Sequence, residues 1–436
     1  MAGARSAARP AASQGSQAAS KTRRVFFSIE FVNGIRRAIL FTLALLYFVS
    51  LGYDPVKVTA VMAISRVLLS IFEFPTGAFA DYYSRKKSVI LSFAIMGLAF
   101  AGFFFFKGFW QLSLCYILSD IGWTFQSGIS MAWAIDALKL GGKKIGITRL
   151  LSRFFFFERV GAVLGGVIGY LILGFEFRYV WLFVAVINIL MMAFLIRHMD
   201  ESNFIPPASL QEQEGEKKSS KKQNGKRWSG MKSLRHLIWN TFRQAKDALV
   251  FLFHKRNRQL QGLAFGIITA SLVIDSFSIL NPLMLFQVLH LGTATISAIT
   301  GGISVILMAA ALLASYAAAH IGFRESMTGM FLAMAAAIVI FAFSHSVVIS
   351  LVTLTIVAIS DYSGGIISLA LQQHNIPSRS RATLGSAMNA LWSLTNALSA
   401  GLVSLGLLFF GLVATTALTS VFALASALIY FLTLKD

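Results

Sequence analysis

Long apolar runs recur along the whole 436-residue chain, and they limit the possible folds more than any other feature. Eighteen or more predominantly apolar residues are enough to cross a bilayer as a helix. Because lipid offers backbone groups no hydrogen-bond partners, spanning segments must be helices or closed barrels. A barrel would show ten-residue segments of alternating polarity, and the sequence has none. We therefore predict an all-α, multi-pass membrane protein.

Composition narrows the possible functions. Hydrophobic residues make up 56% of the chain and charged residues only 13%, against roughly 25% charged residues in a typical soluble domain. The formal charge of +20 does not indicate nucleic-acid binding, because the basic residues lie at the ends of apolar segments, where they set topology. The single cysteine, Cys115, lies in an apolar run, so neither a disulfide framework nor a cysteine metal site is expected.

Signatures of enzymes do not occur in the sequence. The seven His show no metal-ligand spacing, and there is no Gly-rich phosphate loop with its Lys. We therefore expect no metal, no cofactor and no catalytic residues. Since no nucleotide-binding domain is present either, any transport has to draw its energy from ion gradients.

Twelve membrane helices are predicted, in two sets of six. They cover residues 25–50, 57–80, 88–106, 110–138, 148–174, 178–198, 260–288, 293–318, 327–344, 347–372, 382–409 and 411–434. The first set forms an N-terminal bundle over 25–198 and the second a C-terminal bundle over 259–434. Residues 1–24 contain Ala, Ser and Arg but no acid, which predicts a disordered basic tail in the cytoplasm; an organelle transit peptide is the alternative.

The long polar stretch at residues 199–258 separates the two bundles. Its first half is rich in lysine, which is typical of a flexible charged linker. In its second half Ile238, Phe242, Ala245 and Leu249 recur at helical spacing. This spacing predicts an amphipathic helix that lies on the membrane surface.

Basic residues in the short connections predict the orientation. Connections after even-numbered helices carry Arg85, Lys86, Lys87, Lys143, Lys144, Arg149, Arg324, Arg379 and Arg381; those after odd-numbered helices carry Lys57, Lys107 and Arg178. Because Lys and Arg accumulate on the cytoplasmic side, both termini and the linker are predicted to be cytoplasmic, in a cytoplasmic or plasma membrane.

The two halves repeat one short pattern. The fourth predicted helix carries Ser119 and Asp120, and the tenth carries Ser360 and Asp361, each pair followed by a glycine. Matching positions in equivalent helices support two related six-helix bundles, and internal repeats of this kind are typical of transporters.

Residues 72–87 contain a glycine, an acid and a basic cluster at a spacing that resembles the signature loop of the major facilitator superfamily (MFS). Four residues fit that pattern: Gly77, Asp81, Arg85 and Lys86. Ser84 stands where the family usually has Gly. The resemblance covers most of residues 25–434. It implies two pseudo-symmetric six-helix bundles, secondary transport, and a charged cytoplasmic latch that stabilises the outward-facing state.

Glycines recur in the fifth predicted helix. Gly161, Gly165, Gly166 and Gly169 resemble the antiporter motif of the same superfamily, although Gly166 replaces its Pro and Tyr170 its last Gly. The alternative is close helix packing, which small residues at this spacing commonly provide in membranes.

Ionisable side chains near the middle of the predicted helices need an explanation, since each costs roughly 2.5–3.5 kcal/mol on insertion scales. They are Glu30, Arg36, Arg37, Arg66, Asp120, Glu158, Arg159, Asp275 and Asp361. The third, sixth, ninth and twelfth helices have none, and these four face lipid in the superfamily. We expect the charged residues to line the substrate cavity or to carry a coupled proton. The alternative is structural ion pairs, for instance Glu158 with Arg36 or Arg66.

The charges differ between the two halves. With Arg153 and Glu73 included, the first half holds five buried Arg and four acids, whereas the second holds two Asp and no buried Lys or Arg. Arg stays ionised and offers a fork of donors suited to carboxylate or phosphate. The sequence therefore favours an anionic or zwitterionic substrate.

Proton coupling requires a carboxylate that alternates between the protonated and the ionised form. An Asp whose Arg partner changes with conformation can load and release a proton. Asp120 is the leading candidate, because Arg residues of the first, second or fifth helix can reach it. Asn281 and Pro282 interrupt the seventh helix and suggest a hinge or a site there.

Together these patterns predict a proton-coupled secondary transporter of a small organic solute, with efflux favoured over uptake. Its expected partners are the solute, protons or another ion, and membrane lipids, and the chain is expected to act as a monomer. Two alternatives remain open: an importer or facilitator of an anion, and a membrane scaffold that keeps the fold without transport.

Overall fold

The structure is a computed structural model of the chain, and it describes residues 8–138, 144–201, 258–375 and 381–434. These residues are mainly helical, and no strand occurs among them. The N-bundle comprises α1 (Ala8–Ser50), α2 (Pro55–Tyr82), α3 (Arg85–Phe105), α4 (Phe109–Thr124), α5 (Ile129–Ala137), α6 (Lys144–Leu173) and α7 (Arg178–His198). The C-bundle comprises α10 (Arg258–Leu283), the π-helix η2 (Met284–Val288), α11 (Thr293–His320), α12 (Phe323–Phe343), α13 (Val347–Asn375) and α14 (Arg381–Thr433). The amphipathic helix predicted before residue 258 lies outside the described residues.

Ten helices of the described residues are long and apolar enough to cross a membrane. The helix predicted at 110–138 is interrupted between α4 and α5, where Gly128 takes a left-handed conformation (φ 70°) that glycine adopts without strain. α14 covers two predicted helices, and its backbone leaves the helical region at Gly411 (φ 74°, ψ 179°). Counting α4 and α5 as one interrupted span and α14 as two is compatible with twelve segments.

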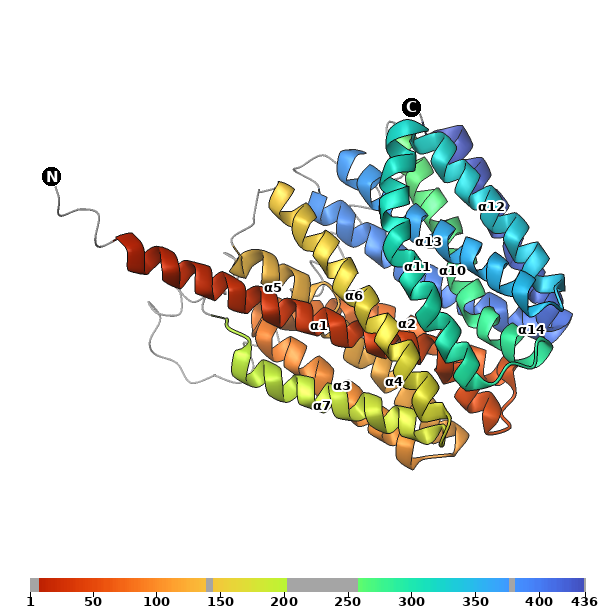
Figure 1. Cartoon of the computed structure of the whole chain (residues 1–436), viewed down its shortest axis with the longest axis horizontal. Helices are drawn as coiled ribbons and strands as arrows, with labels where there is room; N and C mark the ends of the chain where they lie inside the picture. The colour runs from red at the N-terminus through yellow and green to blue at the C-terminus, as the bar shows by residue number, and fades with distance from the viewer. Residues whose placement is uncertain (1–7, 139–143, 202–257, 376–380, 435–436) are drawn as a thin grey trace, which may run out of the picture.

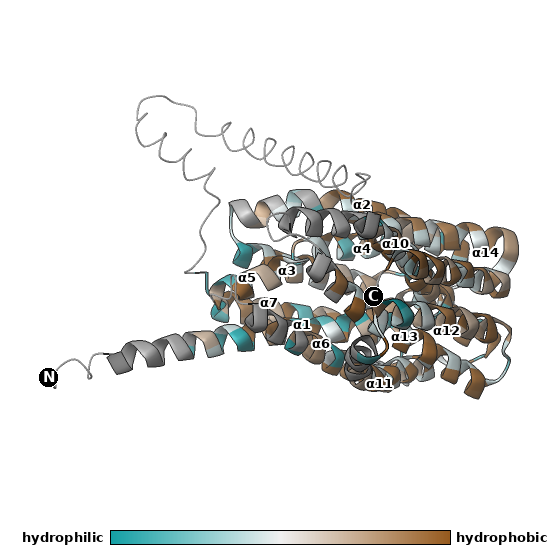
Figure 2. Cartoon of the chain, turned by 90° about the horizontal axis from the view of Figure 1, so that it is seen from above, coloured by the Kyte–Doolittle hydropathy of each residue, from teal (hydrophilic) through white to brown (hydrophobic). Residues whose placement is uncertain are grey.

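The first helix begins earlier than predicted. Residues 8–24 belong to α1, where the sequence suggested a disordered tail. Ala, Gln, Lys and Arg in this segment are good helix formers, and the membrane helix that follows provides the nucleus from which it extends. Figures 1 and 2 show this part of α1 projecting beyond the rest of the protein.

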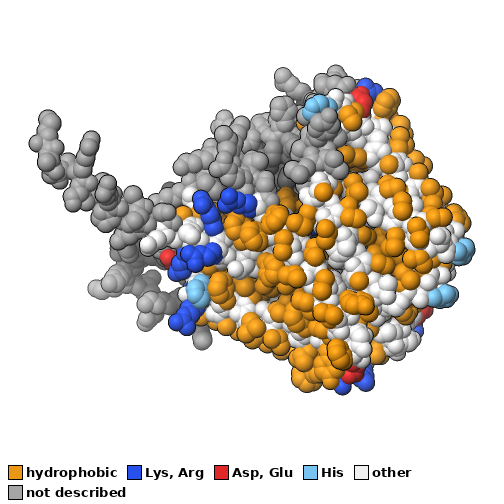
Figure 3. Space-filling model, in the orientation of Figure 1, with side chains coloured by type: hydrophobic (Ala, Val, Ile, Leu, Met, Phe, Trp, Pro, Cys, Tyr) orange, Lys and Arg blue, Asp and Glu red, His pale blue; other side chains and the backbone are white. Residues whose placement is uncertain are grey.

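The molecule has two ends that differ in charge. We call the end that holds Lys86, Lys87 and Arg197 the basic end, and the end that holds the turns at residues 51–54 and 289–292 the opposite end. In Figure 3 Lys and Arg side chains lie at the rims of the visible face, and hydrophobic side chains cover the area between them. An apolar band of this kind is the surface that a bilayer solvates.

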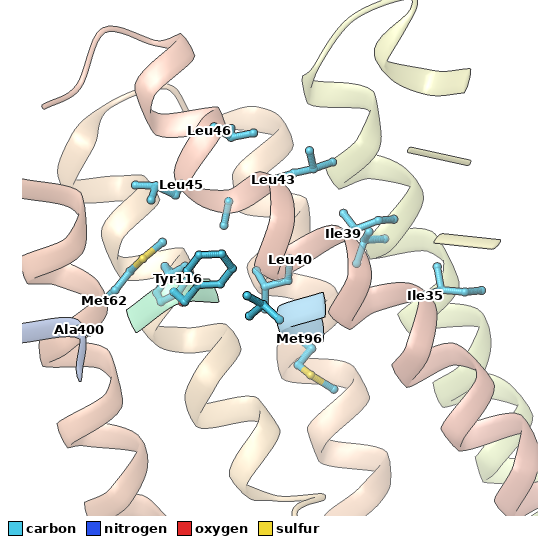
Figure 4. Close-up of a cluster of buried hydrophobic side chains, with 14 of the residues drawn as sticks. Ile35, Ile39, Leu40, Leu43, Leu45, Leu46, Met62, Met96, Tyr116 and Ala400 are labelled. Atoms are coloured by element: carbon cyan, nitrogen blue, oxygen red, sulfur yellow. The ribbon is translucent and has the colours of Figure 1, made fainter. Parts of the chain in front are cut away.

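α1 is the central helix of the N-bundle. It contacts α2, α5, α6 and α7 of its own bundle, and α10 and α11 of the other. Near its end, Tyr47 packs against Trp181 and Phe103, with ring centroids 5.6 and 6.2 Å away. Figure 4 shows Leu43 of α1 and Tyr116 of α4 in the same buried cluster. This packing fixes the depth and rotation of α1, which carries several of the predicted site residues.

Glycines bring α6 close to both of its neighbours. A Cβ atom added at Gly165 would lie 2.7 Å from the carbonyl oxygen of Ile35 in α1, and one at Gly161 would overlap the backbone of Phe31. A Cβ atom at Gly169 would overlap Ser297 of α11. The predicted glycine stripe therefore lies at two helix interfaces, where only a bare backbone fits.

The two bundles contact each other through α6 with α11 and through α2 with α14; α6 and α11 lie side by side in Figure 1. Hydrogen bonds of 3.1 Å between described residues cross the interface at three places: Ser297 Oγ donates to Gly166 O, Ser404 Oγ donates to Val56 O, and Thr42 Oγ1 pairs with Thr300 Oγ1. All three lie in the half of the molecule nearer the opposite end.

Candidate functional site

Arg37 and Glu158 form an ion pair between α1 and α6. Arg37 Nη1 lies 2.6 Å from Glu158 Oε1. The pair forms because Gly34 has no side chain and the backbone of Glu158 passes directly over it. Glu158 therefore pairs with Arg37, and not with Arg36 or Arg66 as the sequence alone suggested.

Asp120 lies between α4 and α2, buried and with two partners on α2. Arg66 Nη1 lies 3.6 Å from Asp120 Oδ1, and Ser65 Oγ donates to Oδ2 over 2.7 Å. Neighbouring residues of α2 thus hold both carboxylate oxygens. A charge-assisted hydrogen bond from a hydroxyl and a nearby guanidinium can stabilise an ionised carboxylate at this depth.

Glu30 lies on α1, two turns nearer the basic end than Arg37, and it is buried. Asn33 Nδ2 and Ser130 Oγ each donate to its carboxylate over 3.3 Å. Arg37 and Glu158 are also within electrostatic range of Glu30. Glu30 therefore belongs to the same charged cluster as the Arg37–Glu158 pair.

Arg36 differs from the other Arg residues of this cluster. Its side chain is only 3% exposed, and within the part of the chain that the structure describes, its Nε and Nη2 atoms make no hydrogen bond. Its guanidinium lies 4.9 Å from the centroid of the Trp123 ring, and that of Arg37 lies 4.4 Å from the same ring. Cation–π contacts stabilise both charges, but they provide no hydrogen-bond acceptor for Nε and Nη2 of Arg36.

Asp275 of α10 faces the N-bundle. It lies within electrostatic range of Arg66 and of Asp361, and the Asn396 side-chain amide of α14, oriented as its neighbours require, donates to the Asp275 carboxylate. Arg66 is therefore within electrostatic range of an acid of its own bundle, Asp120, and of an acid of the other bundle, Asp275.

Asp361 of α13 is half-buried and faces Arg159 of α6 across the interface. Arg159 also stacks on the Tyr362 ring, with its guanidinium 4.4 Å from the ring centroid. Among the described residues, no hydrogen bond or ion pair within 4 Å reaches the Asp361 carboxylate. The fold thus brings the nine predicted charged residues to one interior region, most of them in contact and Asp361 facing them from the C-bundle.

The residues of the predicted gating motif lie at the basic end. Gly77 and Asp81 are in the last turns of α2, and Arg85 begins α3 and pairs with Asp136 of α5. Lys86 donates its backbone N–H to Glu201 over 3.1 Å. Ser84, which replaces the usual Gly, caps α3 by accepting from the Lys87 N–H over 2.9 Å. These contacts join the loop between α2 and α3 to α5 and to the end of α7.

Sequence reasoning missed five residues of the site: Ser65, Trp123, Ser130, Tyr362 and Asn396. Four of them had a signal that was present but unused. Trp123 follows Asp120 by three residues, which places both on one face of α4. Ser65 and Tyr362 are direct neighbours of charged residues, and Asn396 is a polar residue inside an apolar helix. No group of three or more His, Cys, Asp or Glu that could hold a metal ion occurs in the described ranges.

Known proteins share this architecture. Residues 26–400 match the family model described as Major Facilitator Superfamily. The uncharacterised MFS-type transporter YxaM of Bacillus subtilis (strain 168) is 27% identical over 188 residues. That match covers 41% of this chain and 45% of the relative, so the chain matches less than half of that protein's length.

Solved transporters have the same fold at low identity. A POT family transporter in complex with a thioalcohol-conjugated peptide has a TM-score of 0.72 and 12% identity, covering 94% of this chain and 95% of the other. A mutant of the nucleoside transporter NupG has a TM-score of 0.71, 13% identity and coverage of 95% and 100%. A bacterial homologue of the human lysosomal transporter Spinster, in an inward-facing and unoccupied conformation, has a TM-score of 0.68, 14% identity and coverage of 95% and 97%. Because the family model covers most of its length, this chain belongs to the Major Facilitator Superfamily and is a multi-pass membrane protein.

Proposed function

We propose that this protein is a secondary active transporter of a small organic solute with a negatively charged group, driven by protons and working by alternating access. The observation that carries the proposal is the position of Arg66. This residue pairs with Asp120 of its own bundle and faces Asp275 of the other bundle. A partly buried cation that interacts with both bundles can exchange partners during the cycle if the bundles move relative to each other.

The exchange of partners provides a route for the proton. In the described state Arg66 and Ser65 hold the two oxygens of Asp120. A movement of Arg66 toward Asp275 leaves Asp120 buried without a counter-ion, and a buried carboxyl group in that situation favours its neutral form. Asp120 then binds a proton in one conformation and loses it when Arg66 returns. Proton binding is thereby linked to the movement of the bundles.

Three features support an orientation and a direction. The basic end is proposed to face the cytoplasm, because Lys and Arg accumulate there. The hydrogen bonds between the bundles lie nearer the opposite end, which fits a state open to the cytoplasm. The glycine stripe of α6, which resembles an antiporter motif, favours efflux in exchange for protons.

Transport by the purified chain in proteoliposomes tests the proposal. A panel of labelled organic acids, amino acids and neutral solutes is offered with and without an imposed pH gradient. We expect at least one charged solute to accumulate only with the gradient, and a protonophore to abolish the accumulation. Movement of an anion that ignores the pH gradient would favour a facilitator. A chain that moves no solute would favour a scaffold.

A further inference from the structure

Two side chains of α1 are exposed to solvent although other helices surround this part of α1. α1 is surrounded by α2, α5, α6 and α7 of its own bundle and by α10 and α11 of the other. Its residue Phe41 is nevertheless 52% exposed, and the side chain of Arg37, one turn earlier, is 31% exposed. The Arg66 guanidinium lies 5.7 Å from the centroid of the Phe41 ring, so Phe41 faces the charged cluster. We infer that the exposed side chains of α1 border an interior space between the bundles.

The two sides of this space carry opposite charges. The N-bundle contributes Arg37, Arg66 and Arg159, whose charges lie at or near the interface. The C-bundle contributes Asp275 and Asp361, and between residues 259 and 434 its only Lys or Arg residues are Arg324, Arg379 and Arg381, none of which lies in the middle of a helix. The N-bundle side therefore offers guanidinium groups, two of them paired with Glu158 and Asp120, whereas the C-bundle side offers carboxylates with no cation of their own bundle near the middle of a helix.

Arg36 is an N-bundle residue with hydrogen-bond donors available to a solute. The three acids of the N-bundle cluster already have close partners: Glu158 bonds to Arg37, Asp120 to Arg66 and Ser65, and Glu30 to Asn33 and Ser130. The free Nε and Nη2 donors of Arg36 form one edge of its guanidinium, which is the geometry that binds a carboxylate through two parallel hydrogen bonds. Its guanidinium and that of Arg37 meet at the Trp123 ring, so an acidic group bound there accepts from donors that the described residues leave without a hydrogen-bond partner.

Asp361 is the corresponding group on the negative side. Asp275 already accepts a hydrogen bond from Asn396, whereas in the described ranges the Asp361 carboxylate has no hydrogen-bond partner. Arg159, the cation nearest to Asp361, is stacked on Tyr362. A protonated amine has the donors and the charge that Asp361 is missing.

We propose that the transported solute is a zwitterion, whose acidic group binds at Arg36 beside Trp123 and whose ammonium group binds at Asp361. This inference rests on the proposed function and narrows its substrate class. The solute thereby contacts both bundles. Its charges match the two sides of the space between the bundles, and binding desolvates no unpaired charge of either sign.

Binding to matched compounds tests the inference without relying on coupling. The full chain in lipid nanodiscs is offered amino acids from glycine to 6-aminohexanoate and the common α-amino acids. Each is compared with the amine that lacks its carboxyl group and with the acid that lacks its amino group. Thermal shift and direct binding give the affinities. We expect the binders to be amino acids, with about tenfold or greater loss when either charged group is removed, since each removal deletes one charge-assisted interaction.

Variants assign the two ends of the solute. Asp361→Asn should weaken binding of the amino acid about tenfold and leave the matched acid unchanged, whereas Arg36→Gln should weaken both. Arg36→Lys keeps the charge but not the two parallel donors. It should therefore lose affinity for the carboxylate, and it serves as the test if Arg36→Gln does not fold. Glu176→Gln, which alters an exposed pair with Arg178 at the opposite end, is the matched control and should bind as wild type.

The outcomes separate this inference from the proposed function. If only acids without an amino group bind, the inference of a zwitterionic substrate is wrong, while proton-driven transport of an anion stands. If amino acids bind and exchange but never accumulate with a pH gradient, the substrate class stands and the coupling is wrong. Binders confined to amines, an Asp361→Asn variant with unchanged affinity, or a panel without any binder would overturn the inference.

Discussion

Asp120 is a buried carboxylate with one charged partner, Arg66, and one neutral partner, Ser65. Asp120→Asn keeps the shape of the side chain and permanently removes its charge, as protonation does transiently. We expect gradient-driven accumulation to fall to the passive distribution. Exchange of solute across the membrane should stay within about threefold of wild type, a change of only ~0.7 kcal/mol, because exchange needs no net proton movement.

The same vesicles provide the control for this prediction. Accumulation and exchange are measured in parallel for Asp120→Asn and for Glu176→Gln, whose exposed ion pair lies in the turn between α6 and α7 at the opposite end and contributes little. Loss of exchange together with accumulation would assign Asp120 to substrate binding or to structure. Retained accumulation would move the coupling role to Glu30, Asp275 or Asp361.

The sequence predicts how deep each charged residue lies in the membrane, but not which residues it pairs with. Each residue advances a helix by 1.5 Å, so the nine charged residues could be placed near mid-membrane from their positions alone. Which of them touch depends on how each helix is rotated. Arg36 and Arg37 differ by about 100° around α1, and only Arg37 reaches Glu158. Rotation is fixed by contacts such as those at Gly34 and Gly161, which involve residues far apart in the chain.

Among the elements, α6 and α11 form the interface that must open if the transporter is to face the other side. A Cβ atom added at Gly166 would lie 2.5 Å from the Cα of Gly301, so Gly166→Ala forces the two backbones apart. We expect this variant to favour the state in which the bundles are separated at the opposite end. Spin-label distances between α6 and α11 should increase relative to wild type.

Gly302 provides the matched control on the same interface helix. It follows Gly301 directly, but a Cβ atom added there has no neighbour within 4 Å. Gly302→Ala should leave the distances unchanged and be neutral or stabilising by about 0.5–1 kcal/mol, as expected for Gly to Ala in a helix. Equal behaviour of the two variants would show that the α6–α11 interface does not limit the conformational change.

The connection between α2 and α3 is expected to control the basic end. Resemblance to the superfamily implies that Asp81 helps to stabilise the outward-facing state. Asp81→Asn should leave the protein inserted and folded, slow solute exchange, and lengthen the distances between the bundles at the basic end. Glu325→Gln, at an exposed position in the first turn of α12, is the control. An unchanged distance distribution would leave Asp81 with a topological role alone.

Most element boundaries could be predicted to within a few residues, because lipid requires long apolar helices and the polar turns interrupt them. There are two exceptions, and their causes differ. Gly128 adopts a positive φ value inside the predicted helix 110–138, and nothing in a single sequence distinguishes this glycine from others that stay helical. Gly411, by contrast, lies at the break that the sequence predicted between residues 409 and 411. Residues 8–24 lack apolar periodicity, yet they are helical because they extend the membrane-spanning part of α1 toward the N-terminus.

For the whole molecule, the orientation in the membrane decides whether the described conformation opens to the cytoplasm or to the outside. The hydrogen bonds between the bundles lie nearer the opposite end, so the basic end is the side on which the bundles can separate. If that end is cytoplasmic, this conformation loads or releases solute in the cytoplasm. The distribution of Lys and Arg predicts that orientation, and cysteine labelling of intact cells can test it.

The single native cysteine makes that measurement clean, because Cys115 is buried. Gly292→Cys, at the opposite end with free space around the added side chain, should react with a membrane-impermeant maleimide in intact cells. Lys87→Cys, exposed at the basic end, should react only after permeabilisation, and tags at Gly215 and at the C-terminus should behave in the same way. The reverse pattern would place the basic end outside. The described conformation would then be the outward-open state, and efflux would require the opposite order of proton binding and release at Asp120.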